Sequence, residues 1–126
     1  MTPHTVHRPT VLIVDDTPDN LTLISTLLKD RYQTKVATNG ATALQIVASS
    51  SVDLILLDIM MPGMDGFETC RRLKADPLSS AIPVVFLTAK IQAEDEAMGR
   101  EMGGVDFLRK PVNPQTLFAR VAEHLR

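Results

Sequence analysis

Short apolar runs alternate along this chain with longer segments of helical periodicity, and the pattern repeats five times. Each run is too short for a helix and is apolar at consecutive positions, which is typical of a strand buried on both faces of a parallel sheet. The intervening segments place apolar residues three and four positions apart, as an amphipathic helix does. The alternation therefore predicts βα units and an α/β fold.

The five predicted strands cover Thr10–Val14, Gln33–Ala37, Val52–Leu57, Pro83–Leu87 and Val105–Leu108. The second run is the most polar, which indicates an edge strand that meets water on one side. Right-handed crossovers leave few topologies for five such units, and the flavodoxin-like strand order 2-1-3-4-5 is the commonest at this length. We therefore expect a (βα)₅ three-layer sandwich around a five-stranded parallel sheet.

Length and composition limit the number of domains and the class of partner. A chain of 126 residues fits one domain, and 44% hydrophobic with 22% charged residues is ordinary for a globular protein. We expect residues 1–9 to form a flexible N-terminal tail and residues 10–126 to form the folded domain. The formal net charge of -2 provides no basic surplus, so direct nucleic-acid binding is not expected.

The cysteine count and the hydropathy pattern concern the cellular compartment. Cys70 is the only cysteine, which excludes an intramolecular disulfide and a zinc site built on two or more cysteines. We expect this thiol to be half-buried and unreactive. No apolar run approaches the roughly 20 residues that cross a bilayer, and the start of the chain lacks the apolar stretch of a signal peptide. These features favour a cytoplasmic protein without membrane contact.

Polar residues follow four of the predicted strands, at the sheet edge where ligands of such folds bind. They are Asp15 and Asp16 after the first strand, Asp58 after the third, Thr88 after the fourth and Lys110 after the fifth. Three carboxylates in one pocket repel one another unless a cation lies between them. Because no Cys or His accompanies them, the ligand set favours a hard divalent ion, Mg²⁺ first and Mn²⁺ as an alternative.

The same residues indicate a type of chemistry. An Mg²⁺ held by carboxylates keeps positions open for phosphate oxygens, Lys110 offers a second positive charge, and the Thr88 hydroxyl is placed to bond another oxygen. This arrangement predicts phosphoryl transfer. Since the chain has no Walker loop to cradle a nucleotide, the group that accepts the phosphoryl is expected to be a protein side chain or a small molecule.

Four motifs resemble, in order and spacing, those of the receiver domain of two-component response regulators: Asp15-Asp16, Asp58 within LLDIMMPGMDG, Thr88-Ala89 and Lys110-Pro111. The similarity extends from about residue 11 to residue 125, so residues 10–126 are expected to be a receiver domain. The resemblance implies that Asp58 accepts a phosphoryl group from a histidine kinase or a histidine phosphotransfer protein. It implies a signalling switch in a phosphorelay, with no enzymatic turnover beyond self-phosphotransfer and autodephosphorylation.

The resemblance also assigns the metal ligands. Asp15, Asp16 and Asp58 are expected to bind Mg²⁺ together with the backbone carbonyl of Met60. Because a carbonyl is used, a Met side chain at that position is no obstacle. Lys110 is expected to contact the phosphoryl group, and its peptide bond to Pro111 is expected to be cis, although most such bonds are trans.

Further residues are implied in the switch and in self-association. Thr88 is expected to turn toward the phosphoryl group, and Phe107 matches an aromatic switch position that often holds Tyr. Phe keeps the ring but lacks the hydroxyl, and plain core packing is the alternative role for it. Asp106 and Arg120 lie where similar receivers form an intersubunit ion pair, so a phosphorylation-dependent homodimer is suggested.

Two other functions stay open at this point. An Mg²⁺-dependent phosphatase of the haloacid-dehalogenase type also uses an Asp nucleophile after a strand, but it needs a second Asp where this chain has Met60. A receiver that signals by protein contacts without phosphate is the other, and the intact acidic pocket argues against it. The downstream target is unknown. The CRRLKADP and IPVVFLTA stretches resemble receivers joined to cyclic-dinucleotide enzymes or sensor kinases, and a stand-alone regulator is equally consistent.

Overall fold

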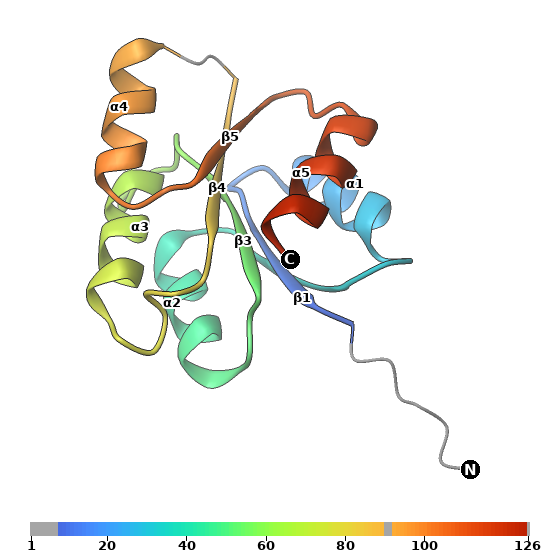
Figure 1. Cartoon of the computed structure of the whole chain (residues 1–126), viewed down its shortest axis with the longest axis horizontal. Coiled ribbons are helices and arrows are strands. Elements are labelled where there is room, and N and C mark those ends of the chain that lie inside the picture. The colour runs from blue at the N-terminus through green and yellow to red at the C-terminus, as the bar shows by residue number, and fades with distance from the viewer. Residues whose placement is uncertain (1–7, 90–91, 126) are drawn as a thin grey trace.

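The computed structural model describes residues 8–89 and 92–125. These residues form five strands and five helices that alternate along the chain (Figure 1). The strands are β1 Thr10–Val14, β2 Gln33–Ala37, β3 Leu54–Asp58, β4 Val84–Thr88 and β5 Asp106–Arg109. The helices are α1 Pro18–Leu28, α2 Gly40–Ser49, α3 Gly66–Ala75, α4 Ala93–Glu101 and α5 Pro114–His124. Most of the tail expected over residues 1–9 lies outside the described residues.

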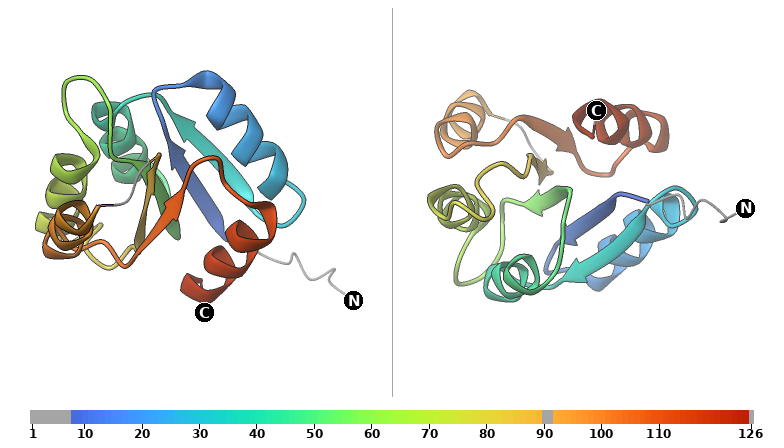
Figure 2. Two further views of the ribbon diagram at one scale, coloured as in Figure 1. Left: turned by 90° about the horizontal axis from the view of Figure 1, so that it is seen from above. Right: turned by 60° about the horizontal axis from the view of Figure 1, so that its bottom comes forward.

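The strands form one parallel sheet in the order β2-β1-β3-β4-β5. Helices α1 and α5 cover one face, and α2, α3 and α4 cover the other (Figures 1 and 2). The predicted fold class, strand order and edge position of the polar second strand are therefore confirmed. None of the helices in the described part of the chain combines the length and apolar character that crossing a membrane requires.

The last three strands end later than their apolar runs. β3 and β4 include Asp58 and Thr88, and β5 runs to Arg109. The register explains this, because Asp58 pairs with Leu87 and Thr88 pairs with Arg109. Ladder hydrogen bonds use the backbone, so pairing continues past the last apolar side chain. The predicted boundaries were wrong here by one or two residues, and Asp58 and Thr88 lie on the strands themselves.

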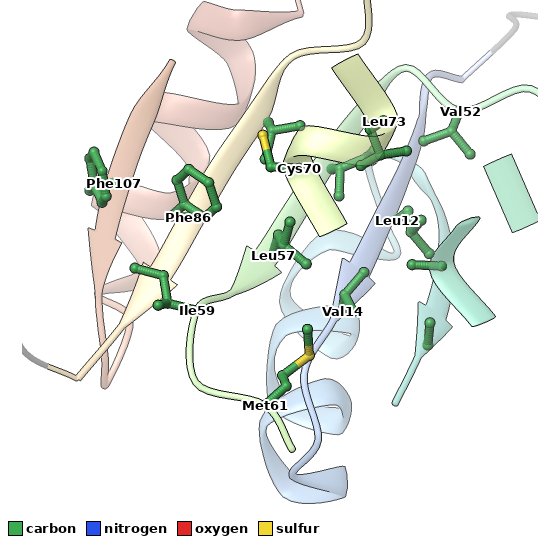
Figure 3. Packing of buried hydrophobic residues seen from close by; sticks show 14 residues of the cluster. Leu12, Val14, Val52, Leu57, Ile59, Met61, Cys70, Leu73, Phe86 and Phe107 are labelled. Atoms are coloured by element: carbon green, nitrogen blue, oxygen red, sulfur yellow. The ribbon is translucent and has the colours of Figure 1, made fainter. Parts of the chain in front are cut away.

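Aromatic rings fill the core beneath α3 and α4. The Phe86 ring lies 5.4 Å, between centroids, from Phe67 on one side and from Phe107 on the other. Figure 3 shows Phe86 and Phe107 on neighbouring strands, with Cys70 of α3 facing the same layer. Cys70 is fully buried, so the expected half-burial was wrong. Burial raises the pKa of its thiol to about 11, which keeps the thiol protonated near neutral pH.

Helix α4 contacts this aromatic layer through a glycine. Gly99 is the one buried residue of α4, and a Cβ added to it would lie 2.5 Å from Cζ of Phe107. The first turn of α4 is acidic, with Glu94, Asp95 and Glu96. Since only a glycine allows this close approach to Phe107, the packing of α4 depends on the position of that ring.

Candidate functional site

The site lies where the strand order reverses, between β1 and β3. Val14 pairs with Leu57, so the residues that follow them, Asp15 and Asp58, lie side by side. One carboxylate oxygen from each of Asp15, Asp16 and Asp58 lies within 4.8 Å of the others. The predicted convergence of three acids is therefore present, at the carboxyl edge where ligands of open parallel sheets bind.

Asp15 is the most enclosed of the three acids, with 0% of its surface exposed. Its Oδ1 accepts a hydrogen bond from the backbone N–H of Thr17 at 2.9 Å. Its Oδ2 accepts one from Nδ2 of Asn20 at 3.3 Å and lies 2.7 Å from Nζ of Lys110. Three donors thus compensate the burial of this charge, as a buried carboxylate requires.

Lys110 connects the two buried acids. Its ammonium nitrogen lies 2.7 Å from Asp15 Oδ2 and 3.1 Å from Asp58 Oδ2. Its backbone N–H donates to the carbonyl of Thr88 at 2.8 Å, and the Lys110–Pro111 peptide bond is cis, the isomer that the resemblance implied. Burial alone would lower the pKa of Lys110, but its hydrogen bonds to Asp15 and Asp58 outweigh that effect and raise the pKa. The side chain is therefore a permanent cation in this pocket.

Asp58 lies at the end of the central strand with 4% of its side chain exposed. Its Oδ1 accepts a hydrogen bond from the backbone N–H of Met60 at 3.3 Å. Burial, followed by the nearby Asp15 charge, raises the pKa of Asp58 to about 6, although Lys110 acts in the opposite direction. At neutral pH the carboxylate is still about nine-tenths ionised.

The remaining site residues lie around this centre. Asp16 is exposed, Thr88 is buried at the end of β4, and the Met60 side chain points outward, with 76% of the residue exposed. A surface cavity of about 300 Å³ extends from Met60 and Thr88 to Gln92 and Asp95 at the start of α4. The loop after β3, the end of β4 and α4 therefore meet beside Asp58.

The sequence did not predict two polar contacts of the site. Neither the Thr17 backbone N–H nor the Asn20 side chain was expected at Asp15, yet both donate to it. A sequence signal exists only for Asn20, a polar residue in the first turn of the helix that directly follows the acids. That position is compatible with many roles, so the contact needed the structure to be recognised.

Asp106 and Arg120 bind each other within the chain. Arg120 Nη1 lies 2.7 and 2.6 Å from the two Asp106 oxygens, and His124 Nε2 lies 3.0 Å from one of them. Burial would raise the pKa of Asp106, but the hydrogen bonds from His124 and Arg120 outweigh it, so the pKa is lowered. Glu123 also lies near Asp106 and His124. The Arg120 guanidinium supplies the positive charge that compensates the two acids. The intersubunit contact stays a prediction.

Phe107 is nearly buried, with 9% of its surface exposed, and its ring packs on Phe86. The ring therefore faces the core in this conformation of the chain. The guanidinium carbon of Arg100 lies 5.9 Å from its centroid, within the range of a cation–π contact. The core-packing role is thus present, and the switch role stays a prediction.

Comparison with known proteins identifies the family of this chain. A family model for the response regulator receiver domain matches residues 11–122. The chain therefore belongs to the response regulator receiver domain family, whose members act as phosphorylation-activated switches in two-component signalling. Receivers of this family interact with histidine kinases and output domains and typically use Mg²⁺ at acidic residues.

Individual relatives agree with this assignment. The chain is 47% identical over 112 residues to "Response regulator PleD" of Caulobacter vibrioides. The matched region covers 88% of this chain and 25% of that protein. It is 47% identical over 117 residues to a "Probable cyclic di-GMP phosphodiesterase" of Vibrio cholerae, which covers 93% of this chain and 26% of the relative. The chain thus spans about a quarter of the length of these two curated relatives.

Solved structures resemble the whole described domain. The chemotaxis protein CheY4 of Vibrio cholerae superposes with a TM-score of 0.91 at 30% identity, covering 94% of this chain and 99% of that one. A putative response regulator of Chloroflexus aurantiacus gives 0.89 at 34% identity, with 94% and 98% covered. The fold of this chain is therefore that of response regulator receivers.

Proposed function

We propose that Asp58 is the phosphoacceptor of this receiver and that its donor is a phosphohistidine on a histidine kinase or a histidine phosphotransfer protein. In this step a P–O bond forms to a carboxylate oxygen of Asp58 while the P–N bond of phosphohistidine breaks. The observation that carries the proposal is the position of Lys110, whose ammonium group lies between Asp58 and Asp15 at the switch point of the sheet.

The surroundings of the three acids favour Asp58 over Asp15 and Asp16 as the phosphoacceptor. Both Asp15 oxygens are engaged, one by Thr17 and the other by Asn20 and Lys110, and the residue is fully buried. Asp16 is exposed, and within the described residues the ion pairs of Lys110 are with Asp15 and Asp58. Asp58 combines contact with Lys110 and a pKa of about 6, so it is an ionised nucleophile near neutral pH without a general base.

The residues around Asp58 fit Mg²⁺. Three carboxylate oxygens lie within 4.8 Å of one another, and Lys110 pairs with two of these three acids. The three acids therefore carry more negative charge than Lys110 balances, and they offer oxygen ligands. Asp15, Asp16, Asp58 and the Met60 carbonyl would hold the ion. When bound, it supplies positive charge against the phosphoryl oxygens, and Mn²⁺ suits the same ligands.

The other site residues act after the transfer. Lys110 would follow the new phosphoryl charge, and the buried Thr88 would donate its hydroxyl to another phosphoryl oxygen. Thr88 and Asp95 border the same cavity, so this movement would reach the start of α4. Phe107 packs against Gly99 of α4, which supports its role as the second moving part of the switch.

Partners follow from the family and the relatives. A kinase or phosphotransfer protein supplies the phosphoryl group, and the receiver then changes its contacts with a target or output domain. One relative is named as a probable cyclic di-GMP phosphodiesterase, which supports an enzymatic output domain in a longer parent protein. The receiver itself catalyses only its own phosphorylation and dephosphorylation. Because phosphohistidine donors draw on ATP, we place the switch in the cytoplasm.

Mass spectrometry with a small phosphodonor tests this proposal. Parent chain, Asp58→Asn and Asp30→Asn are incubated with acetyl phosphate and Mg²⁺, and the mass of each intact protein is recorded. Asp30 is an exposed acid in the loop after α1, so its variant controls for loss of one surface charge. We expect phosphoprotein for the parent and for Asp30→Asn and none for Asp58→Asn. Equal labelling of Asp58→Asn would refute the assignment.

A further inference from the structure

Asn20 makes a side-chain contact with the site that the proposed reaction does not yet use. It lies in the first turn of α1, which follows Asp15 and Asp16, and is half-buried. Its Nδ2 donates to Oδ2 of Asp15 at 3.3 Å, the same oxygen that lies 2.7 Å from Nζ of Lys110. Two donors of different kinds, one neutral and one charged, therefore share one oxygen of a fully buried carboxylate.

The hydrogen bond of the Asn20 side chain stabilises Asp15 more than it stabilises α1. The first turn of α1 has Pro18 at its start, and its N-cap residue Thr17 makes no side-chain hydrogen bond to the helix. A polar side chain three residues after an N-cap often reaches back to the N-cap backbone. Asn20 instead donates to Asp15, and its own backbone N–H is satisfied by the carbonyl of Thr17 at 3.1 Å. Its amide is thus available for a role in the site.

The proposed reaction creates a need for such a donor. Lys110 has to turn from Asp15 toward the phosphoryl group on Asp58, and Asp15 then loses its charged partner. Because Asp15 is fully buried, a lost partner on Oδ2 has to be replaced or the carboxylate is poorly satisfied. Asn20 already lies at that oxygen and carries no charge, so it neither follows the phosphoryl group nor repels a cation.

The donors also fix which part of Asp15 faces an incoming ion. A carboxylate has about four lone-pair positions, and the contacts of Thr17, Asn20 and Lys110 use three of them. Of these three donors, the Thr17 N–H contacts Oδ1, whereas Asn20 and Lys110 contact Oδ2. As long as Asn20 holds Oδ2, Oδ1 is the oxygen that remains oriented for a metal. Partners behind a ligand commonly act on metal affinity in this way.

We propose that Asn20 is a positioning residue of the phosphorylation site: it holds Oδ2 of Asp15 when Lys110 leaves and so keeps Asp15 oriented as an Mg²⁺ ligand. The inference rests on the proposed function, because it takes the Mg²⁺ site and the movement of Lys110 from there. It adds a residue outside the acid, Thr and Lys motifs of the site.

Calorimetric titration of Mg²⁺ into the unphosphorylated chain tests the proposal without any phosphoryl transfer. Asn20→Leu removes the donor at similar volume and is expected to weaken Mg²⁺ binding about tenfold. Asn20→Gln keeps an amide and is expected to recover at least half of that loss on a logarithmic scale. Thr26→Leu, at an exposed position of the same helix, controls for a new apolar side chain and is expected to bind as the parent does.

A second pair of variants separates positioning of Asp15 from an indirect effect through Lys110. In a Lys110→Ala background Asn20 is the remaining side-chain donor to Oδ2, so adding Asn20→Leu is expected to weaken Mg²⁺ binding by the same factor or more. Disappearance of the effect in that background would overturn the proposal. So would parent-like affinity of Asn20→Leu, or a Gln variant as weak as the Leu variant.

These outcomes are distinct from failure of the proposed function. If the parent chain itself binds no Mg²⁺, the metal site of the proposed function fails and this inference is overturned with it. If the parent binds Mg²⁺ and Asn20→Leu binds equally well, only the role of Asn20 is overturned. Thermal unfolding of each variant shows that the comparison is made between folded proteins.

Discussion

Lys110 makes its closest contact with Asp15: the ammonium nitrogen lies 2.7 Å from Asp15 Oδ2. The corresponding distance to Asp58, the proposed phosphoacceptor, is 3.1 Å. The Lys110 ammonium group thus contacts two buried acids that would also hold Mg²⁺. Phosphorylation of Asp58 would draw the Lys110 ammonium group from Asp15 toward residue 58, because the phosphoryl group carries more negative charge than the carboxylate that it modifies.

Removal of Lys110 is therefore expected to strengthen Mg²⁺ binding. In Lys110→Ala the acids lose a competing cation, and the affinity for Mg²⁺ should rise about tenfold or more, measured by calorimetry at low ionic strength. Lys29→Ala removes an exposed lysine at the end of α1 and serves as the matched control. Weaker Mg²⁺ binding by Lys110→Ala than by the parent would contradict this view of the pocket.

The ionisation of Asp58 should be visible directly. Burial and then Asp15 raise its pKa from 3.8 to about 6, and a bound cation favours the ionised form. Carbon-13 NMR of the Asp58 carboxyl group, without Mg²⁺, is expected to titrate with a midpoint near pH 6. Added Mg²⁺ should move the midpoint to lower pH. A midpoint near the ordinary value of an aspartate in both conditions would show that the pocket does not perturb this acid.

Because its pKa is raised in the folded chain, ionised Asp58 lowers the free energy of unfolding near neutral pH. The unfolded chain ionises Asp58 from about pH 4 and the folded chain only from about pH 6, so stability falls as pH rises through this window. Asp58→Asn removes the charge and should raise the free energy of unfolding at about pH 7 by about 1–3 kcal/mol. Below about pH 4 the gain should vanish.

Urea unfolding of parent and Asp58→Asn at both pH values measures this difference. Asp30→Asn, which changes an exposed acid, should leave the free energy of unfolding within about 0.5 kcal/mol of the parent. Addition of Mg²⁺ should reduce the advantage of Asp58→Asn, since only the parent keeps all three carboxylates. A variant that is less stable than the parent at about pH 7 would be incompatible with the raised pKa.

The close contact between Gly99 of α4 and Phe107 is expected to couple the packing of α4 to that of the aromatic rings. An alanine Cβ at Gly99 would lie 2.5 Å from Phe107 Cζ, and overpacking of this kind costs about 1–3 kcal/mol of stability. Gly99→Ala should therefore lower the free energy of unfolding, even though alanine favours helix. In a Phe107→Leu background Gly99→Ala should cost less stability, although the added Cβ would still lie 3.0 Å from Cε2 of Phe86. A double-mutant cycle in urea would show this coupling. Additive effects would exclude direct coupling.

The architecture was predictable because its signals are local. The apolar runs located β1 and β2 with their observed bounds, and alternation with helices led to the strand order. That order in turn predicted that Asp15, Asp58 and Lys110 meet at one edge. The ends of β3, β4 and β5 were missed because backbone pairing with a neighbouring strand, as between Thr88 and Arg109, leaves no trace in hydrophobicity.

The contacts that refine the site could not be predicted. The preference of Lys110 for Asp15 over Asp58 depends on side-chain positions of a few tenths of an ångström. The pairing of Asp106 with both Arg120 and His124 depends on how the last turns of α5 lie on β5. Such contacts join segments far apart in sequence, and patterns of residue type carry no information on their geometry.

The central claim is that Asp58, among three clustered carboxylates, receives the phosphoryl group. The most direct test is to phosphorylate the parent chain in the presence of Mg²⁺, reduce the acyl phosphate with borohydride and sequence the peptides by mass spectrometry. Reduction converts the phosphorylated aspartate to homoserine and so marks its position. Homoserine at residue 58 is the predicted result, and homoserine at Asp15 or Asp16 with an unmodified Asp58 would contradict it.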